Sequence, residues 1–559
     1  MLTWTEIGRI GAFNRERVAI DLDKQLADFT DPLLWPTVSS TATDAEEDLY
    51  SSFTKDYVDI LPENWNVLSL SLSADSTEFV VSRLHKGSTP FLLRLPLRRG
   101  NSDDDEEQFT FEDGRDEMQE LIKLANQSAH AAKTQVDKQM KKQWWKNREA
   151  LDRRMENLLQ NIENVWFGGF RGIFSPAPRG DTAFSRFASA FHHVLDKHLP
   201  SRQKGGRSTS GPKLTLHRNV MELFTGIKDL EAQEDPEETL MDLLYFVVDI
   251  LQFQGERNAY DEIDFDMMVV ETLDALRGYH DAVKSEPAQP QTTHTVLILD
   301  KSLHLFPWES LSCLQGSPVC RVPSLECLRD RILQFRSEQD NNGSRFTINR
   351  SNGSYILNPG GDLQTTQGTF EQDLSKLDRW TGIVNRPPTE DEFQNALENK
   401  SLFLYFGHGS GAQYIRGRTV KRLERCAVAF LMGCSSGTLT EAGEYEPYGT
   451  PMNYLHAGSP ALVATLWDVT DKDIDRFAQA TFDRWGLISG HREGSGTEAG
   501  TGTGTAASKK GKSKAGPASP HDTRVSLDEA VCQSRGACVL KYLNGAAPVI
   551  YGVPAVFLA

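Results

Sequence analysis

Apolar and polar positions follow two patterns along the chain, which divide it near residue 290. In the first part, residues 66–97 alternate apolar and polar residues between turn-forming positions, which predicts a small antiparallel sheet. A proline-free stretch reaching about residue 165 then repeats apolar residues at steps of three and four, which predicts one arm of a helical hairpin docked on the rest of the chain. The repeating positions are Leu151, Met155, Leu158, Ile162 and Val165. Residues 236–284 return to an amphipathic helical pattern.

Beyond a proline-containing linker at residues 286–290, short and continuously apolar runs alternate with helical stretches. The runs are 295–300, 402–406, 427–432, 461–466 and 549–553. Strands that are apolar on both sides have both faces covered, so these runs predict the centre of a mostly parallel sheet. Residues 389–399 begin with Thr389 as a helix cap. This alternation is typical of an α/β fold.

Composition and charge narrow the possible classes of protein. The chain has 559 residues, more than one ordinary domain, and its net charge of −18 opposes a nucleic-acid backbone. Its seven cysteines are an odd number without a paired framework, as expected of reduced thiols. No signal-like N-terminus and no apolar run of roughly 18 residues occur. We therefore expect a soluble protein of the cytoplasm and nucleus.

Two of the buried runs end in a reactive side chain beside glycine. The run ending at Phe406 leads into a Gly-His-Gly sequence centred on His408, and the run ending at Met432 leads into a Gly-Cys sequence that contains Cys434. Ligand sites in open α/β sheets lie at the carboxyl ends of strands, where glycine lets a substrate backbone approach closely. A histidine and a thiol meeting there form the pair that nucleophilic thiol catalysis needs. We therefore predict His408 and Cys434 as the catalytic pair.

Simpler roles exist for each residue taken singly. Cys434 could be a small buried hydrophobic residue, and His408 could be a hydrogen-bonded loop residue. Both close an apolar strand beside glycine, and this coincidence favours catalysis. The histidines at 192, 193 and 198 lack a cysteine or carboxylate set at ligand spacing, so no zinc site is predicted.

The motifs YFGHGSG around His408 and MGCSSG around Cys434 resemble the histidine and cysteine blocks of separases, caspase-fold cysteine peptidases that open cohesin rings at anaphase. Three further segments agree with this family. They are 306–310 (FPWES), 355–363 (YILNPGGDL) and 466–475 (LWDVTDKDID). The resemblance covers residues 295–559 in order and is looser before residue 290. Full-length separases carry a large helical-repeat region in addition, so we expect this chain to be a C-terminal protease fragment.

The resemblance also implies a domain organisation. Residues 291–559 are expected to form a caspase-like catalytic domain, with a mostly parallel sheet flanked by helices. Residues 1–290 are expected to form an α+β substrate-binding, pseudo-protease-like region with a helical insert at about 113–165. The low-complexity stretch at about 486–524, rich in Gly, Ser and Thr, predicts a disordered insertion in the catalytic domain.

For the chemistry, the resemblance implies Cys434 as nucleophile, His408 as proton donor, and the N–H groups of Gly409 and Cys434 as the oxyanion hole. It implies cleavage after arginine in Glu-x-x-Arg-like sites, and hence an acidic reader of the guanidinium in the 466–475 motif. We choose Asp475 first and Asp468 second. Glu309 is a further candidate, although a structural role under the first strand is favoured. No third catalytic residue is apparent.

The expected partners are the cohesin kleisin subunit as substrate and securin as a pseudosubstrate inhibitor, with no cofactor or metal, no direct nucleic-acid contact and no membrane. Two alternatives stay open, a non-catalytic caspase-fold scaffold and a separase-like peptidase with other substrates. The chain itself contains Glu-x-x-Arg at Glu6 to Arg9, at Glu112 to Arg115 and at Glu326 to Arg329. The first, near a terminus, is a hypothetical self-cleavage or substrate-like segment.

Overall fold

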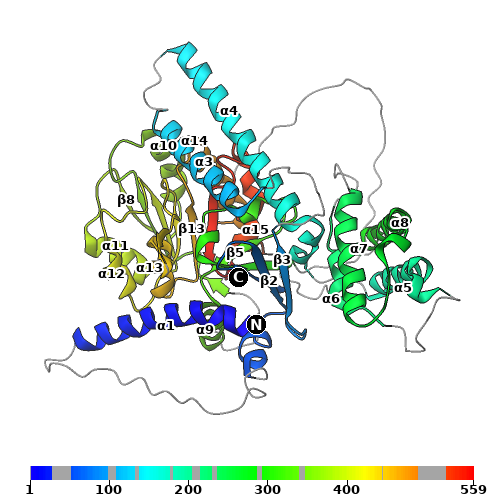
Figure 1. The fold of residues 1–559 in the computed structure, drawn as a ribbon. Helices are drawn as coiled ribbons and strands as arrows, with labels where there is room; N and C mark the ends of the chain where they lie inside the picture. The colour runs from blue at the N-terminus through cyan, green and yellow to red at the C-terminus, as the bar shows by residue number, and fades with distance from the viewer. Residues whose placement is uncertain are drawn as a thin grey trace, which may run out of the picture.

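An eleven-stranded sheet runs through the molecule and joins both parts of the sequence (Figure 1). This computed structural model describes residues 2–27, 52–97, 109–131, 137–176, 181–203, 214–228, 236–285, 292–338, 346–443, 445–488 and 524–558. The predicted linker at 286–290 and nearly all of the predicted disordered insertion at 486–524 lie outside the described residues.

The strands follow the order β3-β2-β1-β4-β5-β14-β13-β10-β9-β7-β8. Their bounds are β1 (Trp65–Leu72), β2 (Glu78–Leu84), β3 (Phe91–Pro96), β4 (His294–Leu299), β5 (Val319–Val322), β7 (Gly353–Leu357), β8 (Thr381–Val384), β9 (Leu402–Phe406), β10 (Val428–Leu431), β13 (Ala461–Thr465) and β14 (Pro548–Gly552). Neighbours are parallel except at β1–β2, β2–β3 and β13–β14. The predicted α/β fold with a mostly parallel sheet is confirmed. Two short pairs lie outside it, β6 (Phe346–Ile348) with β15 (Ala555–Phe557), and β11 (Thr440–Ala442) with β12 (Tyr445–Tyr448).

The segment 66–97 forms the predicted antiparallel strands, but they are not a separate sheet. Strand β1 also pairs in parallel with β4, so these strands extend the main sheet. The polar positions that suggested a solvent-facing side are covered by α1, where Arg9 donates to Ser71 at 2.8 Å and Glu6 accepts from Ser69 at 2.6 Å. A buried hydrogen-bonded pair thus takes the place of water on this face of β1.

The helices form two sets, of which one packs around the sheet and the other stands to one side of it in Figure 1. They are α1 (Leu2–Ala27), α3 (Phe111–Ala131), α4 (Lys138–Asn161), α5 (Asp181–His198), α6 (Arg218–Thr225), α7 (Pro236–Phe253), α8 (Phe265–Ser285), α9 (Leu325–Glu338), α10 (Gln364–Leu374), α11 (Glu390–Glu398), α12 (Gly417–Lys421), α13 (Thr450–His456), α14 (Asp471–Trp485) and α15 (Leu527–Ser534). The amphipathic stretch 236–284 forms α7 and α8, which pack with α5 and α6 in the green group of Figure 1. Helix α11 begins as predicted, because Thr389 and Glu392 form a reciprocal capping box.

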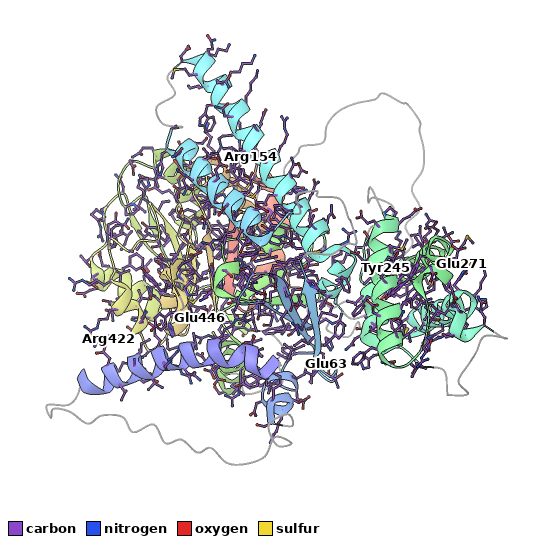
Figure 2. All side chains as sticks on the ribbon, in the orientation of Figure 1. Glu63, Arg154, Tyr245, Glu271, Arg422 and Glu446 are labelled. Carbon is purple, nitrogen blue, oxygen red and sulfur yellow. The ribbon has the colours of Figure 1, made fainter. Side chains whose placement is uncertain are left out.

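The predicted helical hairpin is confirmed as α3 and α4, which pack on each other. Arg154 on α4, labelled in Figure 2, bonds Glu117 of α3 at 2.7 Å. The hairpin docks on the C-terminal part of the chain through Asp152, which accepts the backbone N–H groups of Tyr542 and Leu543 at 2.9 and 2.7 Å. The predicted docking role is therefore also confirmed.

The prediction is wrong at one position of the apolar repeat in α4 and the turn that follows it. Val165 is exposed, whereas its neighbour Trp166 is fully buried. Helix α4 gives way at Ile162 to a π-helical turn over Ile162–Phe167. Its wider i to i+5 spacing rotates the following residues relative to the apolar seam, so a strict helical repeat selects the wrong side chain.

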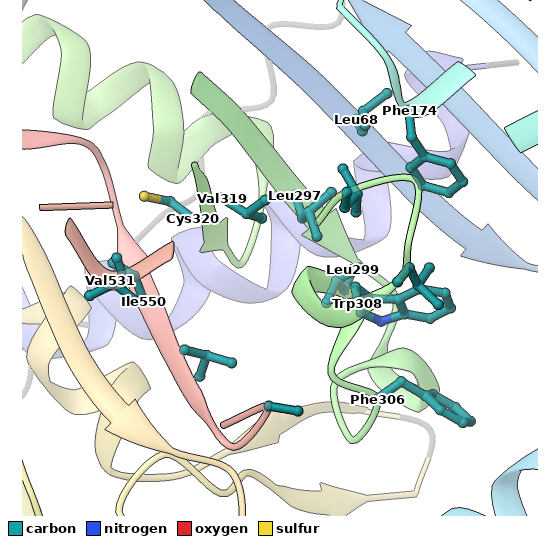
Figure 3. Packing of buried hydrophobic residues seen from close by; sticks show 14 of the residues in the cluster. Leu68, Phe174, Leu297, Leu299, Phe306, Trp308, Val319, Cys320, Val531 and Ile550 are labelled. Carbon is teal, nitrogen blue, oxygen red and sulfur yellow. The ribbon is translucent and has the colours of Figure 1, made fainter. Parts of the chain in front are cut away.

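The core is shared by residues from before and after position 290. Figure 3 shows Leu68 of β1 and Leu297 of β4 beside Val319 of β5, with Ile550 of β14 and Val531 of α15 closing the same layer. Strand β14 lies between β5 and β13 and is antiparallel to β13. The predicted boundary near residue 290 thus falls within one continuous sheet and core.

Glu309 is paired beneath the sheet. Its carboxylate holds Arg321 of β5 through two contacts of 2.6 Å, and both side chains are at most 2% exposed. Burial alone would raise the pKa of Glu309, but the adjacent Arg321 charge lowers it. Glu309 therefore has a structural role, as predicted, although its partner belongs to β5 and not to the first strand of the predicted sheet.

We expect Glu309→Gln to lower the free energy of unfolding by about 3–5 kcal/mol, because it leaves the buried Arg321 charge uncompensated. Denaturant titration measures this. The control is Glu78→Gln, which breaks the exposed pair with Arg94 and should cost less than about 1 kcal/mol. Equal losses in the two variants would contradict a special role for the buried pair.

Candidate active site

The sheet brings the two predicted catalytic loops to one edge. Strands β9 and β10 are parallel neighbours, with Tyr405 opposite Leu431. His408 follows the end of β9, and Cys434 follows the end of β10. Because parallel strands end at the same edge, these two side chains belong to one site, as the sequence predicted.

Glycine at position 433 lets the two loops approach. A Cβ at Gly433 would lie 2.1 Å from the carbonyl oxygen of Gly409 and 2.4 Å from that of Gly407, both closer than any real contact. Tyr405 steadies the histidine loop by donating its hydroxyl to the His408 carbonyl at 2.9 Å. Gly409 itself has φ +59°, in the region that favours glycine.

A small cavity of about 20 Å³ lies where the loops meet. It is lined by Leu363, Thr366, Gly407, His408, Met432, Gly433, Cys434, Thr465, Val469, Asp471, Ile474 and Asp475. His408, Cys434 and Asp475 therefore face one space. A buried water occupies roughly 10–15 Å³ on this measure, so the cavity holds about one or two waters.

Cys434 is half-buried, and its thiol lies 3.5 Å from the carbonyl oxygen of Val469. Cys313, Cys320, Cys327, Cys426 and Cys538 are buried. Burial raises the pKa of Cys426 to about 12, which disfavours a thiolate. Cys532 is half-buried like Cys434, but it does not line the cavity.

Asp362 is a functional candidate that the sequence reasoning missed. Its Oδ2 lies 2.7 Å from Nε2 of His408, and both side chains are about half exposed. Asn358, at the end of β7, turns with φ +52° and accepts the Leu363 N–H at 2.8 Å, which fixes the loop carrying Asp362. The available signal was the turn sequence Asn-Pro-Gly-Gly-Asp directly after a buried strand.

Asp475 is buried at the start of α14 with one oxygen satisfied. Its Oδ2 accepts from Thr366 at 2.8 Å, while Oδ1 has no hydrogen-bond partner among the described residues. Burial raises the pKa of Asp475 to about 7, against the hydrogen bond from Thr366, which lowers it. A buried carboxylate oxygen without a donor is costly, and a cationic ligand would relieve this cost.

Asp468 has a different environment. It does not line the cavity, and its carboxylate accepts from the Ser435 hydroxyl and lies 3.1 Å from Nε2 of His130. Ser435 follows Cys434 with φ +52°, a conformation uncommon for a residue with a side chain. Asp468 thus braces the turn behind the cysteine, and Asp475 is the first-choice acid that the structure brings to the cavity.

The hypothetical self-cleavage segment lies elsewhere. Glu6 and Arg9 are both buried within α1, and Arg9 donates to the Leu70 carbonyl at 2.9 Å. Peptidases read extended chains, so cleavage after Arg9 would require α1 to unwind from β1. Within the described ranges no group of three or more His, Cys, Asp or Glu side chains is placed to hold a metal ion. No helix among the described residues is long and apolar enough to cross a membrane.

Comparisons with known proteins agree with one another. The family model "Separin, protease domain" matches residues 74–474. A separin of Emericella nidulans is 73% identical over 555 residues, covering 99% of this chain and 25% of that protein. A separin of Schizosaccharomyces pombe is 42% identical over 505 residues, covering 90% of this chain and 25% of that protein.

Among solved structures, the chain is similar to one in the crystal structure of the Saccharomyces cerevisiae separase-securin complex. The TM-score is 0.76 at 33% identity, over 91% of this chain and 31% of that chain. The chain thus spans about a quarter to a third of the length of these three relatives.

Proposed function

Because this chain belongs to the separin protease family, we propose that it carries a cysteine endopeptidase site with Cys434 as nucleophile and His408 as proton donor. The observation that carries the proposal is the cavity at the sheet edge, which both side chains line together with Asp475. Asp362 is solvent-accessible, and its contact with Nε2 of His408 orients the imidazole.

In the proposed reaction the Cys434 thiolate attacks the carbonyl carbon of the scissile peptide bond. The new C–S bond forms while the carbonyl electron pair moves to oxygen, where the N–H groups of Gly409 and Cys434 stabilise it. Each such donor contributes about 3 kcal/mol to the transition state. The carbonyl then re-forms and the C–N bond breaks, as His408 gives the leaving amine the proton that it took from the Cys434 thiol. Water hydrolyses the thioester, which releases the carboxylic acid and restores the thiol.

We assign the choice of arginine to Asp475. Its unsatisfied Oδ1 suits a guanidinium, which pairs well with a carboxylate. The segment between β13 and α14 borders the cavity through Val469, so its position shapes the space that a substrate arginine would enter. Asp468, outside the cavity lining, is proposed only to support this segment.

The proposed substrate is the cohesin kleisin subunit, cut after arginine in Glu-x-x-Arg-type sites to release sister chromatids at anaphase. A securin is the proposed pseudosubstrate inhibitor, and the activity is proposed for the nucleus and cytoplasm. The relative solved as a separase-securin complex supports the inhibitor class.

Cleavage of a kleisin-derived Glu-x-x-Arg peptide tests the function, beside a peptide with citrulline in place of arginine. We expect mass spectrometry to show cleavage after arginine alone. If both peptides stay intact and Cys434 does not react with an arginyl acyloxymethyl ketone, the chain is a non-catalytic scaffold. Cleavage of unrelated sequences instead would indicate a related peptidase with other substrates.

We expect Asp362→Asn to lower kcat by about 10-fold to 100-fold with little change in KM, because the amide no longer stabilises the oriented imidazolium. The loss should be smaller than for a buried triad carboxylate, which is worth about 10⁴-fold. Steady-state kinetics on the arginine peptide measures it, with Asp373→Asn on α10 as an exposed control. An unchanged kcat would show that Asp362 does not orient His408.

A further inference from the structure

The helical hairpin α3–α4 holds the segment between β13 and α14 at two places. This segment, residues 466–470, contacts the thiol of Cys434 through the Val469 carbonyl and leads directly into the helix that carries Asp475. Its position therefore affects the shape of the cavity beside Cys434 and Asp475.

The first contact is made by α3. The side-chain oxygen of Asn126 accepts the Asp468 backbone N–H at 2.9 Å, and His130 lies 3.1 Å from the Asp468 carboxylate. Ser435 donates to the other oxygen of the same carboxylate. The middle of the segment is thus fixed between the hairpin and the turn that follows Cys434.

The second contact is a relay from α4. Arg148 donates to Oδ1 of Asn544 at 2.6 Å, and Nδ2 of Asn544 donates to Oδ2 of Asp473 at 2.6 Å. Asn544 also reaches the hydroxyl of Thr470, the N-cap residue of α14, at 3.4 Å. Asp152 of the same helix binds the two backbone N–H groups just before Asn544. The first turn of α14 is therefore attached to α4 through a single amide side chain.

The relay and the cavity use opposite sides of α14. Asp473 and Asp475 are two positions apart, which is roughly 200° around a helix with 3.6 residues per turn. Asp473 faces Asn544, and Asp475 faces the cavity. A shift of the first turn toward or away from the hairpin therefore moves the Asp475 carboxylate out of or into the cavity.

Arg148 is placed as a fixed point for this relay. It is fully buried, it stacks over Trp144, and it also reaches the Ser128 hydroxyl of α3 at 3.3 Å. Burial lowers its pKa to about 10, while the charges of Asp473 and Asp152 raise it, so the arginine remains a cation at neutral pH. A buried cation with an oriented donor holds its partner more firmly than an exposed one.

We propose that Arg148 is a positioning residue for arginine recognition, which sets the place of Asp475 through Asn544 and Asp473. This inference rests on the proposed role of Asp475 in binding the substrate arginine. With this role for Arg148, the hairpin α3–α4 contributes to substrate specificity, although neither of its helices lines the cavity.

The test compares Arg148→Met, Asn544→Leu and the double variant with the unchanged chain. We expect Arg148→Met to raise KM for the arginine peptide roughly 10-fold to 100-fold, the scale of a small misplacement of a binding group, with a smaller change in kcat. The double variant should raise KM no more than the larger single effect, since both substitutions cut one relay. The control is Arg154→Met on the same helix, whose half-exposed pair with Glu117 stays within the hairpin.

Three results would overturn the inference. The first is that the increases in KM of the two single variants add up in the double variant. The second is that Arg148→Met lowers kcat by roughly 10-fold to 100-fold and leaves KM unchanged. The third is that Arg148→Met lowers the melting temperature and leaves both kinetic constants unchanged. If the unchanged chain cleaves no peptide, the proposed function fails, but the relay can still be tested. Agmatine, a small guanidinium, should then protect Cys434 from iodoacetamide, and Arg148→Met should weaken this protection. Equal protection in both proteins would contradict the relay alone.

Discussion

Replacing Cys434 with serine should lower kcat for the arginine peptide by roughly 10⁵-fold or more, the scale seen when a catalytic nucleophile is removed. The reason is chemical rather than structural. Serine fits the same space, but its hydroxyl is far less acidic than a thiol, and the half-exposed His408 cannot generate an alkoxide readily. We expect the variant to retain its melting temperature and to bind the peptide with little change in affinity.

A matched control is available in Cys532→Ser. Cys532 is the other half-buried cysteine, and it lies outside the cavity lining. This variant should keep full activity and should still be labelled at Cys434 by an arginyl acyloxymethyl ketone. Cleavage that persists in Cys434→Ser, or disappears in Cys532→Ser, would remove the central assignment of the nucleophile.

The second large effect is expected at Asp475. Asp475→Asn should lower kcat/KM for the arginine peptide by about 10²-fold to 10³-fold, because truncating one partner of a buried charged contact costs about 2–5 kcal/mol. The asparagine is nearly isosteric and can still accept from Thr366. The loss should therefore reflect charge rather than shape, and a citrulline peptide should be affected little. Peptide kinetics at a fixed pH measures both values.

The Asp475 carboxyl group also determines whether kcat/KM and stability rise or fall with pH. Because the pKa of Asp475 is raised to about 7, the empty site is largely protonated below pH 7 and ionised above it. A guanidinium stays charged throughout, so kcat/KM should rise as the pH increases through about 7, and this rise should be absent from Asp475→Asn. A raised carboxyl pKa also means that stability falls as the pH rises from the unfolded value toward 7. Asp475→Asn should thus be more stable than the unchanged chain at pH 8.

Asp483→Asn provides the control for Asp475, since Asp483 is exposed near the other end of the same helix. It should change neither the specificity nor the pH profile. If Asp475→Asn cleaves the arginine peptide normally, another acidic residue reads the guanidinium. A gain in stability without a loss of arginine preference would lead to the same conclusion.

The proposed catalytic pair was accessible to sequence reasoning because its signal is local. His408 and Cys434 each close a continuously apolar strand beside glycine, and parallel neighbours share an edge. Five of the eleven strands of the large sheet followed from such apolar runs. The run at 402–406 matches β9 residue for residue. The capped start of α11 is equally local.

Other features depend on contacts between distant segments. Asp362 lies 46 residues before His408, and they meet only because β7 neighbours β9 in the sheet. The pairing of β1 with β4 also joins distant segments. The serines of β1 suggested a solvent-exposed face, but they form hydrogen bonds with α1. No periodicity encodes such partners. The relay from Arg148 belongs to the same class, because its three members come from three separate parts of the sequence.

The position of β14 has a consequence for synthesis. This strand, Pro548–Gly552, is made after every other strand of the large sheet, yet it sits between β5 and β13. Until it leaves the ribosome, the strands on its two sides form two separate half-sheets with open edges. Such edges pair readily with other chains, and contacts this distant in sequence form slowly. A nascent chain of this protein is therefore exposed to aggregation until β14 inserts, and only then do the strand that leads to Cys434 and the N-terminal strands join one scaffold.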